Sequence, residues 1–129
     1  MLFGAVLVKG DKVMATGQNQ VLTQNGHTYH AELGLIREHC HSHQLTDLSD
    51  HTLYTSCEPC VMCACACLWV KLGRLVYSCS KKTMDKYAGK RIEIDCKQLF
   101  EGSTFKPEVM GGVLEDEVEK VFHGYDWNR

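Results

Sequence analysis

The alternation of apolar and polar residues predicts two short strands at the start of the chain. Phe3 to Lys9 and Lys12 to Gln18 both have this pattern, and Gly10-Asp11 between them suits a tight hairpin turn. From His30 to Cys40, apolar residues recur at three- and four-residue spacing, which is typical of a helix with one apolar face. We therefore expect a β-hairpin followed by an amphipathic helix.

The middle of the chain reads as strand, helix, strand. Thr52 to Ser56 and Arg74 to Ser80 are the two strands. Pro59 suits the first position of the helix between them, which we expect to run to about Lys71 and to stop before Gly73. The body of this helix is apolar on every side, so we expect it to be buried all round against a sheet.

A last, acidic helix is predicted near Leu114 to Phe122. The alternation of strands and helices predicts an α/β fold. A chain of 129 residues suits one core and is short for two, so we expect residues 1–129 to form a single domain.

Composition excludes several classes of protein. The net charge is −2, and no run of about eighteen apolar residues could span a bilayer. Met1 to Val8 lacks a basic leading region and an obvious cleavage site, so we expect no secretion signal there. Most of the eight cysteines cluster in the chain, which favours metal binding and helix packing over a disulfide framework. A cytoplasmic protein is the expectation.

Two short motifs carry the chemistry: His30-Ala31-Glu32 and Pro59-Cys60-Val61-Met62-Cys63. His30, Cys60 and Cys63 are ligand types that zinc prefers, and Glu32 is a carboxylate that need not bind metal. A structural zinc site uses four protein ligands, whereas a catalytic one uses three and leaves a position for water, whose pKa zinc lowers. The motifs predict one zinc ion per chain, with Glu32 as the group that moves protons beside it.

These motifs resemble those of the cytidine-deaminase superfamily. The H-x-E and P-C-x-x-C signature is that of zinc-dependent base deaminases. The chain is most similar to the branch that holds guanine deaminase, fungal cytosine deaminase and the tRNA adenosine deaminases, from Phe3 to about Ala88. The resemblance implies a three-layer α-β-α fold, a mixed central sheet of about five strands and a homodimer. Family members usually have a helix before the first strand, and this chain begins almost on that strand.

The resemblance also implies residues that touch a substrate. Asn19 stands where the family places an asparagine against the substrate, although it also suits a turn. The backbone N–H of Ala31 would donate to a substrate oxygen. Phe3 is either an aromatic wall or a core residue. Trp127 either closes over the pocket or simply packs.

The favoured function is a zinc-dependent hydrolytic deaminase of nucleobase metabolism. It would convert the exocyclic amine of a free nucleobase or related heterocycle, of the guanine or cytosine type, to a carbonyl and release ammonia. The alternative is a tRNA adenosine-to-inosine deaminase, since Lys71 to Arg91 holds seven basic residues and one acidic residue. We interpret this stretch as a solvated loop face, and the acidic final helix argues against RNA.

Two other classes of protein compete. Cys57, Cys60, Cys63 and Cys67 have the spacing of a ferredoxin-type iron–sulfur run, which would indicate electron transfer. A non-catalytic zinc module would need a fourth ligand such as Cys57. The iron–sulfur interpretation leaves the His30-Ala31-Glu32 motif unexplained.

The remaining cysteines and a histidine tract have simpler interpretations. We interpret Cys65, Cys67, Cys79 and Cys96 as small apolar residues. A tract of three histidines with one cysteine, at His39, Cys40, His41 and His43, could suggest a second metal site. Because such tracts are only compositional signals, we interpret it as a polar helix end or loop.

Overall fold

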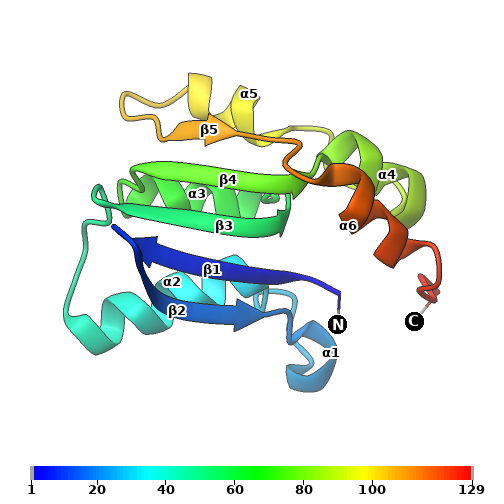
Figure 1. The fold of residues 1–129 in the computed structure, drawn as a ribbon, viewed down its shortest axis with the longest axis horizontal. Helices are drawn as coiled ribbons and strands as arrows, with labels where there is room; N and C mark the ends of the chain where they lie inside the picture. The colour runs from blue at the N-terminus through cyan, green and yellow to red at the C-terminus, as the bar shows by residue number, and fades with distance from the viewer. Residues whose placement is uncertain (1, 129) are drawn as a thin grey trace.

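The computed structural model describes residues 2–128, which form a five-stranded sheet with helices packed around it (Figure 1). The strand order is β2-β1-β3-β4-β5, and β1 pairs antiparallel with β2 and β3, whereas β3, β4 and β5 are parallel. The strands are β1 (Gly4–Lys9), β2 (Lys12–Gln18), β3 (His51–Cys57), β4 (Arg74–Cys79) and β5 (Glu108–Met110). The predicted hairpin and mixed sheet are confirmed.

Helices α2 and α3 lie behind the sheet in Figure 1 and cover one of its faces. Side chains that alternate along the central strands, such as Leu7, Leu53 and Leu75, point to these helices and are fully buried. The helices are α1 (Val21–Gln24), α2 (Ala31–His43), α3 (Val61–Trp69), α4 (Lys81–Ala88), α5 (Cys96–Glu101) and α6 (Glu115–Phe122). This helix and strand content confirms the predicted α/β fold and is consistent with three layers.

Connection β3–α3–β4 is a parallel crossover, which places the start of α3 at the carboxyl end of β3. In open α/β sheets, ligands bind outside the carboxyl ends of the parallel strands. The cap of α2, His30, lies at the same place, because its ring contacts the first turn of α3. The fold thus gathers two helix N-termini where one strand ends.

Helix α3 differs from the prediction at both ends. It begins at Val61 with Cys60 as its N-cap, so Pro59 precedes the cap. It ends at Trp69, and Lys71 adopts the left-handed conformation at φ 53°. Gly73 is not the stop. It lies so close to the backbone of Ser49 that a Cβ atom there would overlap the Ser49 carbonyl.

The prediction that α3 is buried all round is wrong. Only Cys63, Ala64 and Cys67 are buried in this helix, and Trp69 is 85% exposed. The sheet covers one side of α3, so apolar composition alone did not decide how much of the helix is buried.

The basic stretch from Lys71 to Arg91 is also not a loop. It contains β4 and α4, and Ser80 caps α4 by accepting a hydrogen bond from the backbone N–H of Thr83. Among residues 2–128, no helix is long and apolar enough to cross a bilayer.

Candidate metal centre and active site

His30, Cys60 and Cys63 converge although thirty residues separate the histidine from the first cysteine. Their ligand atoms all lie within 4.8 Å of one another. His30 is the N-cap of α2, Cys60 is the N-cap of α3, and Cys63 lies in the first turn of α3. The structure therefore brings together the three predicted ligands and no fourth group from residues 2–128.

The spacing of these atoms fits zinc. Nδ1 of His30 lies 3.5 Å from Sγ of Cys60 and 3.7 Å from Sγ of Cys63. Zinc binds nitrogen at about 2.0–2.1 Å and sulfur at about 2.3 Å, so its tetrahedral ligands lie about 3.6 Å apart. One imidazole and two thiolates form a donor set known from catalytic zinc sites with an open fourth position.

The electrostatics of the site favour a metal-binding thiolate. Hydrogen bonds from Cys63 and then His30 lower the pKa of Cys60 to about 4. The pKa of Cys63 is raised, chiefly by its hydrogen bond to Cys60 and secondly by burial. Cys60 is therefore the thiol that ionises first. The hydrogen bond with Cys60 raises the pKa of His30. Cys60 also lies at the positive end of the α3 dipole, which stabilises a thiolate further.

Glu32 lies two residues beyond His30, in the first turn of α2, and is only 7% exposed. Its Oε1 accepts a hydrogen bond of 2.6 Å from the hydroxyl of Thr55 on β3. The same Thr55 oxygen lies 3.5 Å from the carbonyl oxygen of Gly4. A strand residue thus fixes the orientation of the carboxylate beside the ligand group, a partner that the sequence did not predict.

Asn19 is buried and held from both sides. Its side-chain Oδ1 accepts a hydrogen bond from the backbone N–H of Val21 at 2.9 Å. Its backbone N–H donates to the carbonyl of Phe3 at 3.0 Å. The interpretation as a turn residue is therefore correct for Oδ1. This backbone donor holds Oδ1 in place and leaves the amide N–H groups of Asn19 as its available donors.

Ala31 is the first residue of α2 and is buried. The N–H groups of a first helical turn have no partner inside their own helix. The N–H of Ala31 is accordingly a donor that the helix itself leaves unused, next to His30 and Glu32.

Phe3 and Trp127 belong to one aromatic cluster at the end of the sheet where both termini lie (Figure 1). Their ring centroids are 6.3 Å apart, and Trp127 donates its indole N–H to the carbonyl of Phe122 at 3.2 Å. Trp127 therefore has a packing role. It connects the C-terminal segment to Phe3, whose carbonyl holds Asn19.

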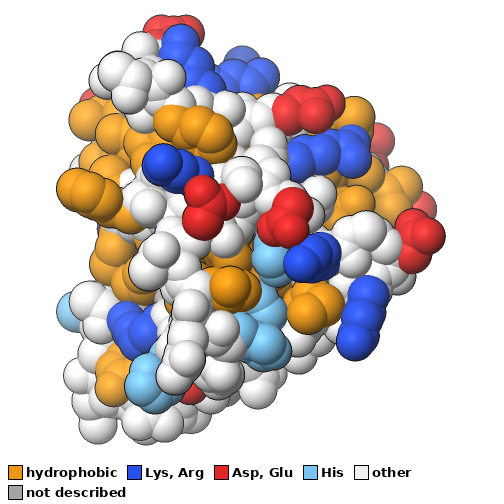
Figure 2. All heavy atoms as spheres, turned by 90° about the vertical axis from the view of Figure 1, so that its left-hand side faces the viewer, with side chains coloured by type: hydrophobic (Ala, Val, Ile, Leu, Met, Phe, Trp, Pro, Cys, Tyr) orange, Lys and Arg blue, Asp and Glu red, His pale blue; other side chains and the backbone are white. Residues whose placement is uncertain are grey.

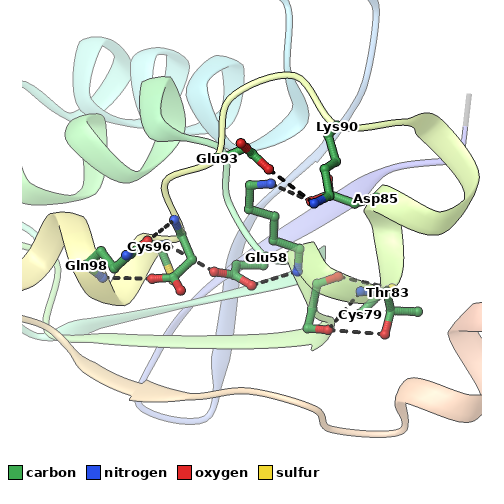
Figure 3. A network of polar contacts seen from close by, with 11 residues as sticks. Glu58, Cys79, Thr83, Asp85, Lys90, Glu93, Cys96 and Gln98 are labelled. Carbon is green, nitrogen blue, oxygen red and sulfur yellow. Dashed lines mark hydrogen bonds and ion pairs between the residues drawn. The ribbon is translucent and has the colours of Figure 1, made fainter.

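Glu58 is a residue of the site that sequence reasoning missed. Its carboxylate accepts the N–H of Lys81 at 2.7 Å and the N–H of Cys96 at 3.0 Å, while its own N–H donates to Cys79 (Figure 3). Lys81 and Cys96 begin α4 and α5, so one carboxylate satisfies the N-termini of two helices. Glu58 precedes Cys60 by two residues and anchors the loop that carries this ligand.

Cys57 and Cys67 do not join the ligand group. Cys57 packs in the cluster of Phe122 and Cys79, and Cys67 is buried in the main core. Within residues 2–128 the structure therefore does not assemble the four-cysteine group of an iron–sulfur run, or a zinc site closed by Cys57. Burial raises the pKa of Cys67, which agrees with its interpretation as a small apolar residue.

Comparison with known protein families shows which family the chain belongs to. Residues 1–79 match the family described as the cytidine and deoxycytidylate deaminase zinc-binding region. The chain belongs to this family. Zinc is accordingly the metal that the group of His30, Cys60 and Cys63 fits.

The similar proteins of this family act on different substrates. The chain is 46% identical over 76 residues to guanine deaminase of Bacillus subtilis (strain 168), which covers 59% of the chain and 49% of that protein. It is 39% identical over 83 residues to the tRNA-specific adenosine deaminase of Buchnera aphidicola subsp. Schizaphis graminum (strain Sg), which covers 64% and 55%. The chain thus spans about half the length of these relatives.

A solved structure has the same fold over most of the chain. The structure of guanine deaminase from Nitrosomonas europaea superposes with a TM-score of 0.79 at 25% identity, covering 94% of this chain and 70% of that one.

Proposed function

We propose that this protein is a zinc-dependent hydrolytic deaminase that replaces the exocyclic amine of a free nucleobase, or of a related heterocycle, by a carbonyl. The observation that carries the proposal is the group of His30, Cys60 and Cys63, beside a buried carboxylate, Glu32, that is not one of the ligands. Zinc held by these residues would lower the pKa of a coordinated water toward neutrality and so supply the nucleophile.

Glu32 is the residue that moves protons. Hydrolysis of C–NH₂ by water needs two protons taken in turn from the water oxygen, one given to a ring nitrogen and one given to the departing ammonia. Thr55 occupies Oε1 of Glu32, so Oε2 is the oxygen free to accept a proton and to return it. The carboxylate does not need to rotate between these transfers.

Thr55 suits both states of this carboxyl group. Its hydroxyl donates to Oε1 when Glu32 is ionised. When Glu32 holds a proton on Oε2, its Oε1 is still an acceptor, and the same hydroxyl donates to it. The buried carboxyl group therefore keeps its partner throughout the reaction.

The remaining residues recognise the ring. The Ala31 N–H would donate to a ring oxygen, and the amide nitrogen of Asn19 would donate to a second acceptor on the same substrate. Asn19 is held by the N–H of Val21 and the carbonyl of Phe3, so its amide needs little ordering when substrate binds.

A free base is the favoured substrate class. The C-terminal segment packs through Trp127 against Phe3, at the strand end that holds Asn19, which favours a small, enclosed ligand. The net charge of −2 and three acidic residues in the first turn of α6 oppose a polyanion.

A tRNA adenosine is the second candidate. The similarity to tRNA-specific adenosine deaminase supports it as directly as the similarity to guanine deaminase supports the first. The basic residues of the Lys71 to Arg91 stretch would then contact phosphates flanking an extruded base.

A substrate panel tests the proposal and separates the candidates. Ammonia release is measured from zinc-loaded protein with guanine, cytosine, isocytosine, adenine, their nucleosides and a tRNA anticodon stem-loop. Release from a free base that is absent in Glu32→Ala supports the proposal. Release from the stem-loop alone supports the second candidate. No release from any compound, at one zinc per chain, contradicts both.

A further inference from the structure

A second group of imidazoles lies at the opposite end of α2, where the chain enters β3. His39 on α2 and His51 at the start of β3 are each 3% exposed, and their Nε2 atoms are 3.3 Å apart. His39 is thus a core residue and not the polar helix end that the sequence suggested. Figure 2 shows histidine side chains gathered on this face of the molecule, with lysine or arginine and acidic side chains nearby.

Hydrogen bonds define the protonation of this pair. Nδ1 of His51 lies 2.7 Å from Oδ1 of Asp50, and a carboxylate only accepts, so Nδ1 of His51 carries a proton. In neutral His51, Nε2 is therefore an acceptor, and His39 donates to it from its own Nε2. One proton lies between the two Nε2 atoms. The buried Nδ1 of His39 has no hydrogen-bond partner among residues 2–128.

This geometry is that of two ligands to one metal ion. Nitrogens that share a tetrahedral metal at bond lengths of about 2.0–2.1 Å lie about 3.3–3.4 Å apart. Histidine ligands typically donate their other N–H to a carboxylate, which is the contact of His51 with Asp50. The other carboxylate oxygen of Asp50 pairs with Lys9 at 3.2 Å on the surface.

A third imidazole lies on the same helix, although the ligand atoms of the three histidines do not all lie within 4.8 Å of one another. His43 follows His39 by four residues, a spacing that places two histidines on one helix face, and their ring centroids are 4.3 Å apart. Nδ1 of His43 lies 3.1 Å from the carbonyl of His39, which makes it the protonated nitrogen and leaves Nε2 unprotonated. His43 is exposed and can turn its side chain toward the pair, which also gives an ion a route from solvent.

We propose that His39 and His51, completed by His43, form a second metal site that takes a divalent transition metal such as Zn²⁺, Co²⁺ or Ni²⁺ through imidazole nitrogens. On binding, the metal takes the place of the proton on Nε2 of His39, and this proton moves to Nδ1, so that His39 binds as a neutral imidazole. Burial, together with the neighbouring His43 and His51, lowers the pKa of His39, which favours the neutral ring that a metal requires. Because the site holds no thiolate, its spectroscopic properties differ from those of the first centre.

Titration of untagged protein with Co²⁺ at neutral pH tests the proposal. The expected result is two equivalents per chain. One equivalent gives the intense near-ultraviolet band of thiolate–cobalt charge transfer. The other binds without that band and, because neutral imidazoles hold it, with no net release of protons in weak buffer. His51→Gln should lose only the second equivalent, and His41→Gln, a change at an exposed neighbour, should keep both.

Asp50→Ala covers the case in which a buried histidine variant fails to fold. Its carboxylate is 59% exposed, and its loss should weaken the second equivalent about 10–100-fold and leave the first unchanged. Saturation of the wild-type protein at one equivalent would overturn the proposal. So would a second equivalent that survives in both His39→Gln and His51→Gln.

Discussion

Thr55 and Glu32, 23 residues apart in the sequence, are joined by a buried hydrogen bond of 2.6 Å between the Thr55 hydroxyl and Oε1 of the carboxylate. Thr55 stands on the central strand β3 and Glu32 in the first turn of α2. The bond therefore attaches the carboxylate to the central strand of the sheet, beside a ligand group that lies at two helix N-caps.

Thr55→Val should impair catalysis more than binding. Valine has nearly the shape of threonine but no hydroxyl, so Glu32 loses the contact that orients it. A hydrogen bond to a charged group contributes about 1.5–3 kcal/mol, which corresponds to a fall in kcat of about 10–100-fold. Steady-state kinetics should show KM and zinc content within about threefold of wild type. Thr55→Ser keeps the hydroxyl and should restore most of kcat, whereas equal losses in both variants would refute a positioning role.

Glu58→Gln should destabilise the fold. The carboxylate accepts the N–H groups of Lys81 and Cys96, and an amide can present an oxygen to only one of them. We expect a loss of about 1–3 kcal/mol in the free energy of unfolding, measured by urea denaturation at one zinc per chain. Glu93→Gln is the control, because Glu93 is 69% exposed and, in the described part of the chain, forms an ion pair only with Lys90. A Glu58 variant as stable as this control would contradict the anchoring role.

Gly73→Ala and Gly34→Ala should have opposite effects. A methyl group at Gly73 would overlap the Ser49 carbonyl, and backbone cannot give way cheaply, so we expect a loss of about 1–3 kcal/mol. At Gly34, inside α2, a methyl group meets no atom within 4 Å, and alanine should be neutral or add up to about 1 kcal/mol through helix propensity. The Tm values of the two variants are compared by thermal unfolding. Similar Tm values would contradict the close contact between position 73 and the Ser49 carbonyl.

Acid should destabilise the protein in part through His39. Burial and the neighbouring His43 and His51 lower its pKa from 6.5 in the folded state. Below pH 6.5 the unfolded chain takes up a proton that His39 in the folded protein does not. As the pH is lowered, the free energy of unfolding therefore decreases by up to about 1.4 kcal/mol per pH unit, until the pKa of folded His39 is reached. Above pH 6.5 both states are neutral and this contribution is constant.

Unfolding free energies between pH 5 and 8 check this expectation. His39→Gln should flatten the pH dependence below pH 6.5 relative to wild type. The exposed control His41→Gln should keep it. An unchanged slope in His39→Gln would mean that His39 titrates normally in the folded protein.

The sequence predicted what is encoded locally. The Gly10-Asp11 turn identifies the hairpin, and the spacing of Cys60 and Cys63 places both at the start of one helix. Helix α2 was also predicted, but with its end near Cys40, whereas it continues for three more residues to His43. The histidines in these last residues do not continue the apolar pattern. Strand β5 was not predicted, since its three residues carry too little periodicity.

Partners distant in the sequence could not be predicted. Glu58 reaches the N–H of Cys96, 38 residues away, and only the parallel β3–α3–β4 arrangement brings the two together. The contact of His39 with His51 likewise depends on how α2 packs against the start of β3. A histidine tract that appeared only compositional in the sequence therefore contains a buried residue.

The central claim is that Glu32 carries protons beside a zinc ion that His30, Cys60 and Cys63 hold. Glu32→Gln tests it most directly, because the amide keeps the size of the side chain and an oxygen that can accept from Thr55, but cannot take up a proton. Ammonia release from the best substrate of the panel is compared at equal zinc content. The account predicts one zinc in the ligand group of both proteins and a loss of at least about 1,000-fold in kcat for the variant. A Glu32→Gln protein within about tenfold of wild type would contradict it.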